Sequence, residues 1–390
     1  MPQPIAVGSD NKADCRVAIT PSDSVRIEVA TKNRNLLGTG IRTVATAVCE
    51  TLGVETGTVA VEDRGALDYV IAARVEQALR ISSSDEIPPL RPSVDRAPSP
   101  HDRLRRSRLY APGNNPRLLV GIDLHGADCV LLDLEDSVPP SEKAAARILV
   151  KHLLATVQFP EEVWVRINPL DTYGRDDLAE VLLGRPDGIC LPKVESDKDI
   201  LDAAEAMAQI EQRVGTPVGA TWLMPIIETA NGVLHCEQIA TAHERVAVLA
   251  FGAEDFTRDV GAARTQASLQ FARSMIVTAA KAAGVQASDT VYANLEDEQG
   301  LIAETREARD LGFDGKGAIN PRQIAPIHAV FAPSKDEVQE ARRIVTAAEE
   351  AQKQGRGAIA IGGKMIDRPV LDRARKTLDL AARIRKGGAR

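Results

Sequence analysis

The chain has 390 residues, of which 44% are hydrophobic and 26% charged, and this composition is typical of a folded globular protein with apolar mass for more than one core. Its 48 basic and 55 acidic side chains give a net charge of −7, and no basic stripe with interleaved aromatic residues offsets that acidity, so we expect no nucleic-acid partner. The apolar runs have the length of strands, far below the roughly 20 residues of a membrane span, and no apolar signal segment stands at the N-terminus. We therefore expect a cytoplasmic protein without membrane association. The five cysteines form no C-x-x-C pair, which predicts reduced, buried thiols.

A proline- and serine-rich run without hydrophobic periodicity divides the chain and predicts a linker at residues 82–104. Before it we expect a small α+β domain at residues 1–81. After it we expect a larger domain at residues 105–332, followed by a C-terminal extension at residues 333–390. The two domains should fold separately.

The small domain alternates apolar and polar residues at 17–19 and again at 25–29, with a turn between them, which predicts a β-hairpin. Residues 58–61 repeat the alternation and predict a further strand. Apolar residues at helical spacing predict helices at 41–52 and 67–79.

The large domain alternates short apolar strands with helical stretches, which is the signature of repeated βα units. The expected strands are residues 108–110, 129–135, 163–168, 188–194, 222–228, 246–254, 290–294 and 312–319. The clearest expected helices are residues 141–154, 197–214, 262–283 and 297–311. Eight such units without a glycine-rich dinucleotide loop favour an α/β fold of the (β/α)8 TIM-barrel type. In the extension, helices at 336–354 and 370–385 should flank a glycine-rich strand or loop.

Charged side chains stand where several of these strands end, and in a barrel the chemistry lies at that edge. They are Glu135 and Asp136, Arg166, Lys193, Glu228 and Asp255. Carboxylates gathered without histidine or thiolate suit Mg²⁺, which prefers oxygen ligands, and Glu228 with Asp255 is the natural pair. The alternative for any one of these acids is that it caps the helix that follows it.

Eight motifs in chain order resemble the citrate lyase β subunit family, within the wider acyl-coenzyme A lyase superfamily. They are RRSRLYAPG (105–113), LDLEDSV (132–138), VRIN (165–168), LPK (191–193), IET (227–229), FGAED (251–255), GKGAINPRQ (315–323) and GKMID (363–367). The match spans residues 105–390. The forms DTVY at 289–292 and INPRQ at 319–323 are more similar to citryl lyases than to malyl lyases.

The resemblance implies a Mg²⁺-dependent carbon–carbon lyase that cleaves a citryl thioester into oxaloacetate and an acetyl thioester. In this reading Glu228 and Asp255 hold the metal, and Arg166 stabilises the enolate that leaves. Glu135 and Asp136 orient metal-bound water. Further roles follow from the same resemblance: Asp367 as an acid–base group that reaches into a neighbouring subunit, and Arg106, Arg117 and Lys193 as partners of the phosphates of a coenzyme A-like group. A homotrimer or a multiple of it is therefore expected.

The small domain resembles the citrate lyase acyl carrier protein, or γ subunit, through VAVEDRGALD at 59–68. The serine that carries the prosthetic group in that family falls on Lys12 in this chain, and lysine cannot form the phosphodiester. Ser9 is the alternative attachment point if the loop register is shifted. We expect no phosphoribosyl-dephospho-coenzyme A on this chain.

Two other functions stay open at this stage. The first is a lyase or thioesterase for free citramalyl-, malyl- or citryl-coenzyme A, with the small domain kept as structure, and Lys12 favours it. The second is a non-catalytic scaffold that docks a citrate lyase α-type transferase subunit. The intact set of Arg166, Glu228, Asp255 and Asp367 weighs against a scaffold.

Overall fold

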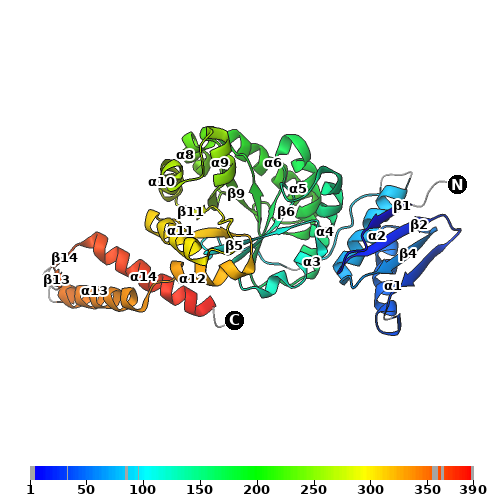
Figure 1. Ribbon diagram of the computed structural model, residues 1–390, viewed down its shortest axis with the longest axis horizontal. Helices are drawn as coiled ribbons and strands as arrows, with labels where there is room; N and C mark the ends of the chain where they lie inside the picture. The colour runs from blue at the N-terminus through cyan, green and yellow to red at the C-terminus, as the bar shows by residue number, and fades with distance from the viewer. Residues whose placement is uncertain are drawn as a thin grey trace.

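The computed structural model describes residues 5–32, 34–83, 87–94, 96–353, 359–361 and 364–387. Parts of the expected linker and of the expected C-terminal extension, including Gly363 of the GKMID motif, lie outside the described residues. The chain forms a small α+β domain beside a closed barrel, and two long helices project from the opposite side of the barrel (Figure 1).

The small domain is a four-stranded sheet with two helices. Its strands are β1 (Ile5–Gly8), β2 (Cys15–Thr20), β3 (Val25–Ala30) and β4 (Gly57–Asp63), and its helices are α1 (Arg34–Thr51) and α2 (Asp68–Ser82). Buried valines and isoleucines of the sheet and of both helices form the core of this domain. The strands and helices expected from the sequence are present.

The expected hairpin between the second and third strands is wrong. The strand order is β1-β2-β4-β3, so β4 lies between β2 and β3 and pairs with both. It runs antiparallel to β2, with Val17 opposite Val61, and parallel to β3, with Ile27 opposite Val59. The reason is the helix α1, which follows β3 and returns the chain for a parallel pairing that a tight turn cannot provide.

The large domain is a closed barrel of eight parallel strands. They are β5 (Ser107–Pro112), β6 (Cys129–Asp133), β7 (Glu162–Arg166), β8 (Gly188–Leu191), β9 (Trp222–Ile227), β10 (Val248–Phe251), β11 (Gln286–Asp289) and β12 (Gly315–Ala318). Side chains such as Leu131 and Trp164 pack inside the barrel, whereas Leu132 and Val165 belong to the core between strands and helices. This alternation confirms the TIM-barrel prediction.

Helices surround the barrel between the strands (Figure 1). They are α3 (Pro116–Leu119), α4 (Lys143–Thr156), α5 (Arg175–Val181), α6 (Asp197–Val214), α7 (Ala230–Leu234), α8 (Cys236–Thr241), α9 (Ala253–Val260), α10 (Gln266–Ala283), α11 (Glu298–Leu311) and α12 (Ile324–Phe331). The strand expected at residues 290–294 is wrong, because the seventh strand is β11 at Gln286–Asp289. Its buried Asp289 pairs with Arg273 and Lys316, so this strand is stabilised by ion pairs rather than by an apolar run.

The C-terminal extension consists of α13 (Lys335–Lys353), the short strands β13 (Ile359–Ile361) and β14 (Lys364–Ile366), and α14 (Arg368–Gly387). The two strands pair antiparallel at the far end of the projection, and α14 runs back beside α13 (Figure 1). Near its end Arg383 contacts Asp102 in the segment that precedes the barrel.

Helix α2 contacts both domains. One face packs on the sheet of the small domain, and Tyr69, Val70 and Ala73 belong to the core of the barrel domain. Next to them Glu76 is fully buried and accepts hydrogen bonds from Lys151 Nζ at 2.7 and 2.9 Å, and its Oε2 lies 2.6 Å from Nε2 of His152. We call these groups, with Arg80 and Glu180, the interdomain ion cluster.

All five cysteines are buried and free, as expected. No helix in the described part of the chain is both long and apolar enough to cross a bilayer.

Candidate active site

A cavity of 570 Å³ opens at the carboxyl ends of the barrel strands. Residues from six of the strands or the loops after them contribute polar groups to its wall: Arg108, Asp133, Asp136, Arg166, Glu228, Asp255 and Thr290. Apolar side chains such as Phe251 and Ile226 complete it. A pocket of this size, apolar with a few converging polar groups, is where a small substrate binds in this type of fold.

Arg166 ends β7 beside the last residue of β6, Asp133, and the strand register pairs these two residues. Its guanidinium makes two parallel hydrogen bonds to Asp133, at 2.6 and 2.8 Å, and a further ion pair of 2.9 Å to Glu135. The ring of Tyr110 lies 5.5 Å from the guanidinium carbon. Burial disfavours the charge of Asp133, but Arg166 outweighs this and lowers the pKa of that carboxyl. Arg166 is thus held as a fixed cation in the cavity wall.

Glu135 lies between two cations. Besides Arg166 it pairs with Nζ of Lys193 at 2.8 Å, and its side chain is only 5% exposed. Burial raises the pKa of Glu135 although both cations favour its charged form. Lys193 has a left-handed backbone, with φ of 53°, which is uncommon for a residue other than glycine. This conformation directs its amide toward Glu228, whose Oε1 accepts a hydrogen bond of 2.8 Å.

Glu228 and Asp255 are the expected metal ligands, and both line the cavity. Burial, with the negative charges of Glu135 and Asp255, raises the pKa of Glu228 to about 8. Gly252 lies against this carboxylate, because a Cβ at residue 252 would stand 2.4 Å from Oε2 of Glu228. Within the described ranges no group of three or more histidine, cysteine, aspartate or glutamate side chains is arranged around a common metal position. Two carboxylates in an anionic cavity nevertheless fit Mg²⁺, which is held by one or two carboxylates while water and substrate complete its shell.

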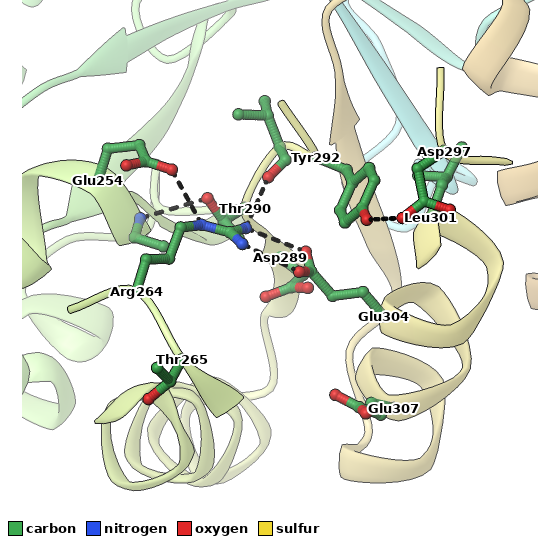
Figure 2. A network of polar contacts seen from close by, with 12 residues as sticks. Glu254, Arg264, Thr265, Asp289, Thr290, Tyr292, Asp297, Leu301, Glu304 and Glu307 are labelled. Carbon is green, nitrogen blue, oxygen red and sulfur yellow. Dashed lines mark hydrogen bonds and ion pairs between the residues drawn. The ribbon is translucent and has the colours of Figure 1, made fainter. Parts of the chain in front are cut away.

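The segment that carries Asp255 is fixed by a polar network (Figure 2). Arg264 pairs with Glu254 at 2.9 Å and with Glu304 of α11 at 3.2 Å, and it donates to the carbonyl of Val291 at 3.1 Å. The amide of Ala253, at the start of α9, donates to Oγ1 of Thr290 at 3.2 Å (Figure 2). These contacts join α9, α11 and the loop after β11, and so set the position from which Asp255 enters the cavity.

The structure brings six of the expected site residues to the same edge of the barrel: Glu135, Asp136, Arg166, Lys193, Glu228 and Asp255. Among these, Asp136 is largely exposed and lies 3.6 Å from Arg166.

Four other expected residues lie elsewhere. Arg106 precedes β5 at the opposite end of the barrel, where it pairs with Asp128 at 2.7 Å, so the structure does not bring it to this cavity. Arg117 on α3 and Lys12 both line a second cavity between the two domains. Asp367 is exposed at the start of α14, at the far end of the C-terminal projection, and does not line the active-site cavity of its own chain.

Ser9, the alternative attachment point, is partly buried. Its hydroxyl donates to Asp14 at 2.8 Å. The side chain of Lys12 is exposed.

Arg108 is not among the residues expected at the site, yet it is only 2% exposed and lines the cavity from within β5. Its guanidinium carbon lies 5.3 Å from the ring of Tyr110, Nη1 lies 3.3 Å from the sulfur of Met224, and Nε has no hydrogen-bond partner among the described residues. The signal was present in the sequence, because an arginine inside an apolar barrel strand is unusual unless it faces a ligand.

Two family models cover most of the chain. Residues 106–321 match the family described as HpcH/HpaI aldolase/citrate lyase, and residues 3–82 match one described as malonate decarboxylase delta subunit (MdcD). The chain is 43% identical over 283 residues to the citrate lyase subunit beta of Haemophilus influenzae, which covers 72% of this chain and 97% of that protein. It is 35% identical over 302 residues to human mitochondrial citramalyl-CoA lyase, covering 72% of this chain and 87% of that protein.

A solved structure is also similar. The protein CitE from Mycobacterium tuberculosis, in complex with magnesium, acetoacetate and coenzyme A, is 31% identical and superposes with a TM-score of 0.59 over 72% of this chain and 98% of that chain. Together with the geometry of the barrel mouth, these matches show that the chain belongs to the HpcH/HpaI aldolase/citrate lyase family and is a lyase with a carrier-like N-terminal domain.

Proposed function

We propose that the chain cleaves a citryl thioester to oxaloacetate and an acetyl thioester, with Mg²⁺ held by Glu228 and Asp255. The observation that carries this proposal is the arrangement of a fixed cation, Arg166, in the same cavity as two carboxylates, one of which, Glu228, has its pKa raised to about 8 by burial and by the nearby negative charges of Glu135 and Asp255. When bound, the metal supplies Lewis-acid polarisation of the hydroxyl and carboxylate oxygens of the substrate.

Cleavage requires a base that removes the proton of the substrate hydroxyl. The carbon–carbon bond then breaks, its electron pair moves into the thioester to form an enolate, and a proton is returned to carbon to give the acetyl group. Arg166 is the residue that stabilises the enolate oxygen, because its guanidinium is held in place by Asp133 before the reaction begins. Little reorganisation is then needed as the charge develops.

Substrate orientation is assigned to Arg108. Its guanidinium is buried in the cavity wall and has no carboxylate partner among the described residues, so a carboxylate of the substrate fits as its partner. Glu135 and Asp136 then orient water near the metal-binding pair.

Asp367 remains the proposed acid–base group, acting in the site of a neighbouring subunit. Its exposed position at the far end of the projection, outside the cavity of its own chain, supports this assignment. A homo-oligomer, proposed as a trimer or a multiple of one, is then required for activity. Whether an α-type transferase subunit binds the same assembly is tested by co-purification.

The alternative is a thioesterase or lyase for free citramalyl-, malyl- or citryl-coenzyme A. It is favoured by Lys12, which replaces the serine of the carrier family, and by a 37% identical relative named (3S)-malyl-CoA thioesterase from Cereibacter sphaeroides. In this case free coenzyme A thioesters are the only substrates, and no modifying enzyme is needed.

The two reactions release different products. We would incubate the purified chain with each coenzyme A thioester and Mg²⁺, and follow keto acid by a coupled dehydrogenase and free thiol by a thiol reagent. Lysis gives keto acid without thiol, whereas hydrolysis gives thiol without keto acid. We expect keto acid to form from the citryl thioester. Its formation should stop when EDTA is added and resume when Mg²⁺ is restored. Thiol release alone would replace the lyase proposal by the thioesterase.

A further inference from the structure

The second cavity, of 510 Å³, lies between the N-terminal domain and the barrel. The loop of residues 8–14 and helix α2 form one wall, and the loop before α3 and the start of α4 form the other. Its lining is mostly polar, with amides and hydroxyls such as those of Asn11, Asn115 and Ser141. We call it the interdomain cavity.

Two cations in this cavity are available to a ligand. Lys12 comes from the N-terminal domain and Arg117 from the barrel, both are exposed, and neither has an ion-pair partner within the described ranges. A third cation, Arg74, is already neutralised, because it is buried and bonds to both oxygens of Asp14 at 3.0 and 3.2 Å. The interdomain cavity therefore presents one free cation on each wall.

One carboxylate, that of Glu142, also lines the cavity and is not part of an ion pair in the described residues. It accepts a hydrogen bond of 2.5 Å from Nδ2 of Asn114. The free charges on the lining are thus two positive and one negative, which favours an anion with several oxygens over a neutral ligand.

The interdomain cavity and the active-site cavity share two loops. In the segment from the end of β5 to α3, Pro112 and Leu118 line the active-site cavity, whereas Asn114 and Arg117 line the interdomain cavity. The loop after β6 is divided in the same way, with Ser137 on the active-site cavity and Ser141 on the other. The same two segments therefore border both cavities, as a ligand with one end in each cavity requires.

The two walls of the interdomain cavity are held at a fixed distance by the interdomain ion cluster. Glu76 on α2 binds Lys151 and His152 of α4, and both helices also line the cavity through Arg74 and Ala145. Since breaking a buried ion pair is costly, the cavity is preorganised and does not form only when a ligand arrives.

We propose that the interdomain cavity binds the phosphate-bearing nucleotide end of a free coenzyme A thioester, with Lys12 and Arg117 as its cationic partners, while the acyl group occupies the barrel mouth. The inference rests on the proposed action on acyl thioesters. It assigns to the N-terminal domain a non-covalent role in place of covalent attachment, since Lys12 stands where the carrier family has its serine. The citrate lyase subunit beta of Haemophilus influenzae and human citramalyl-CoA lyase each align with 72% of this chain. A subsite to which the N-terminal domain contributes one wall is therefore a feature of the two-domain arrangement.

The direct test is calorimetric binding of coenzyme A and of adenosine 3′,5′-bisphosphate to the full chain. Lys12→Glu and Arg117→Glu should each weaken both ligands about tenfold, the effect of losing one charge-assisted contact at a solvent-accessible site. Lys32→Glu is the matched control, because Lys32 is an exposed lysine of the same domain that does not line the cavity. Lys12→Gln separates loss of the contact from charge repulsion, and a thermal melt checks that each variant is folded.

A second test uses turnover. The ratio of kcat/KM for citryl-coenzyme A to that for the citryl thioester of N-acetylcysteamine, which lacks the nucleotide, should fall about tenfold in Lys12→Glu and stay at the wild-type value in Lys32→Glu.

The failure of this inference is distinguishable from the failure of the proposed function. If no citryl thioester is cleaved but Lys12→Glu still weakens bisphosphate binding, the proposed interdomain site is supported and the proposed lyase reaction is refuted. Equal affinities in wild type, Lys12→Glu and Arg117→Glu would overturn the interdomain site, as would absence of bisphosphate binding by the wild type.

Discussion

The backbone amide of Lys193, held at φ of 53°, donates a hydrogen bond of 2.8 Å to Oε1 of Glu228. One residue thus contributes twice to the site, because its ammonium also pairs with Glu135 at 2.8 Å. Substitution can separate the two contributions. Any residue that adopts this backbone conformation can donate the amide hydrogen bond to Glu228, whereas only lysine supplies the ammonium that pairs with Glu135.

We predict that Lys193→Gly is more stable than Lys193→Ala by about 1 kcal/mol, because glycine adopts a positive φ without strain. Both variants keep the amide and lose the ammonium, so their losses of kcat should be similar. Chemical unfolding and turnover of the two variants, measured side by side, check both statements. An alanine variant as stable as the glycine variant would show that the backbone of residue 193 stores no strain.

Glu228→Gln and Asp255→Asn should abolish Mg²⁺-dependent turnover and Mg²⁺ binding while leaving the thermal melt nearly unchanged. Each replaces a carboxylate of the cavity wall by an amide of nearly the same shape and removes no apolar group from the core. Glu237→Gln is the control, since Glu237 is an exposed carboxylate of α8 that does not line the cavity. Calorimetry with Mg²⁺ is the measurement, and wild-type binding by the Glu228→Gln, Asp255→Asn double variant would refute the metal assignment.

Gly252→Ala should impair metal binding without a backbone effect. The φ of Gly252 is −108°, which any residue adopts, but the added Cβ would stand 2.4 Å from Glu228 Oε2 and displace that carboxylate. Gly40→Ala is the control, because a Cβ there meets no atom within 4 Å and alanine favours helix α1. The Mg²⁺ affinity should fall at least tenfold in the first variant and stay at the wild-type value in the second.

The interdomain ion cluster predicts a specific pH dependence. Burial alone would raise the pKa of Glu76, but the contacts with His152 and Lys151 outweigh it and lower the pKa from 4.5 to about 2. A depressed carboxyl pKa contributes stability above the unfolded-state value, and this contribution is lost as the pH falls from about 4.5 toward 2. Glu76→Gln should therefore be less stable than the wild type by about 3 kcal/mol at pH 7, with the difference shrinking in that acidic window. Urea unfolding of both proteins from pH 7 to pH 3 measures it, and a difference independent of pH would contradict the assignment.

Subunit complementation tests Asp367. An Asp367→Ala chain and an Arg166→Ala chain should each be inactive, yet oligomers refolded from a mixture should recover activity. Recovery is expected because some interfaces then combine an intact Arg166 site with an intact Asp367 from the other chain. Native mass spectrometry must first establish that mixed oligomers form, and separately refolded chains are the control. No recovery in such mixtures would place Asp367 in its own chain or outside the reaction.

Much of the fold could be predicted from local signals. Helix α6 has the bounds that the sequence predicts, because Ser196 forms a capping box with Asp199 at its start and Gly215 ends it with φ of 74°. The order of strands in the small sheet could not be predicted. Two alternating segments joined by a turn favour a hairpin locally, and only the long-range pairing of β4 with both of them decides otherwise.

The candidate site divides in the same way. The sequence places Glu228, Asp255 and Arg166 at the mouth of the barrel, because a charge at the end of an apolar strand is visible in it. It could not place Arg264 and Thr290 there, since their contacts with α9 and α11 are encoded by no local pattern. The motif that contains Arg106 led us to expect this residue among the phosphate partners. Arg106 comes before β5 and therefore lies at the other end of the barrel.

The contacts of helix α2 hold the two domains together without help from the linker as a covalent connection. Tyr69, Val70 and Ala73 are part of the barrel core, and the amide of Leu90, in the linker itself, donates to the buried Glu76 at 2.9 Å. Covalent continuity is therefore not what keeps the two domains together. A protease that nicks the chain between the domains would leave two fragments that remain associated and co-elute until the barrel itself unfolds, and the N-terminal fragment released at that point would expose an apolar helix face and an unpaired carboxylate.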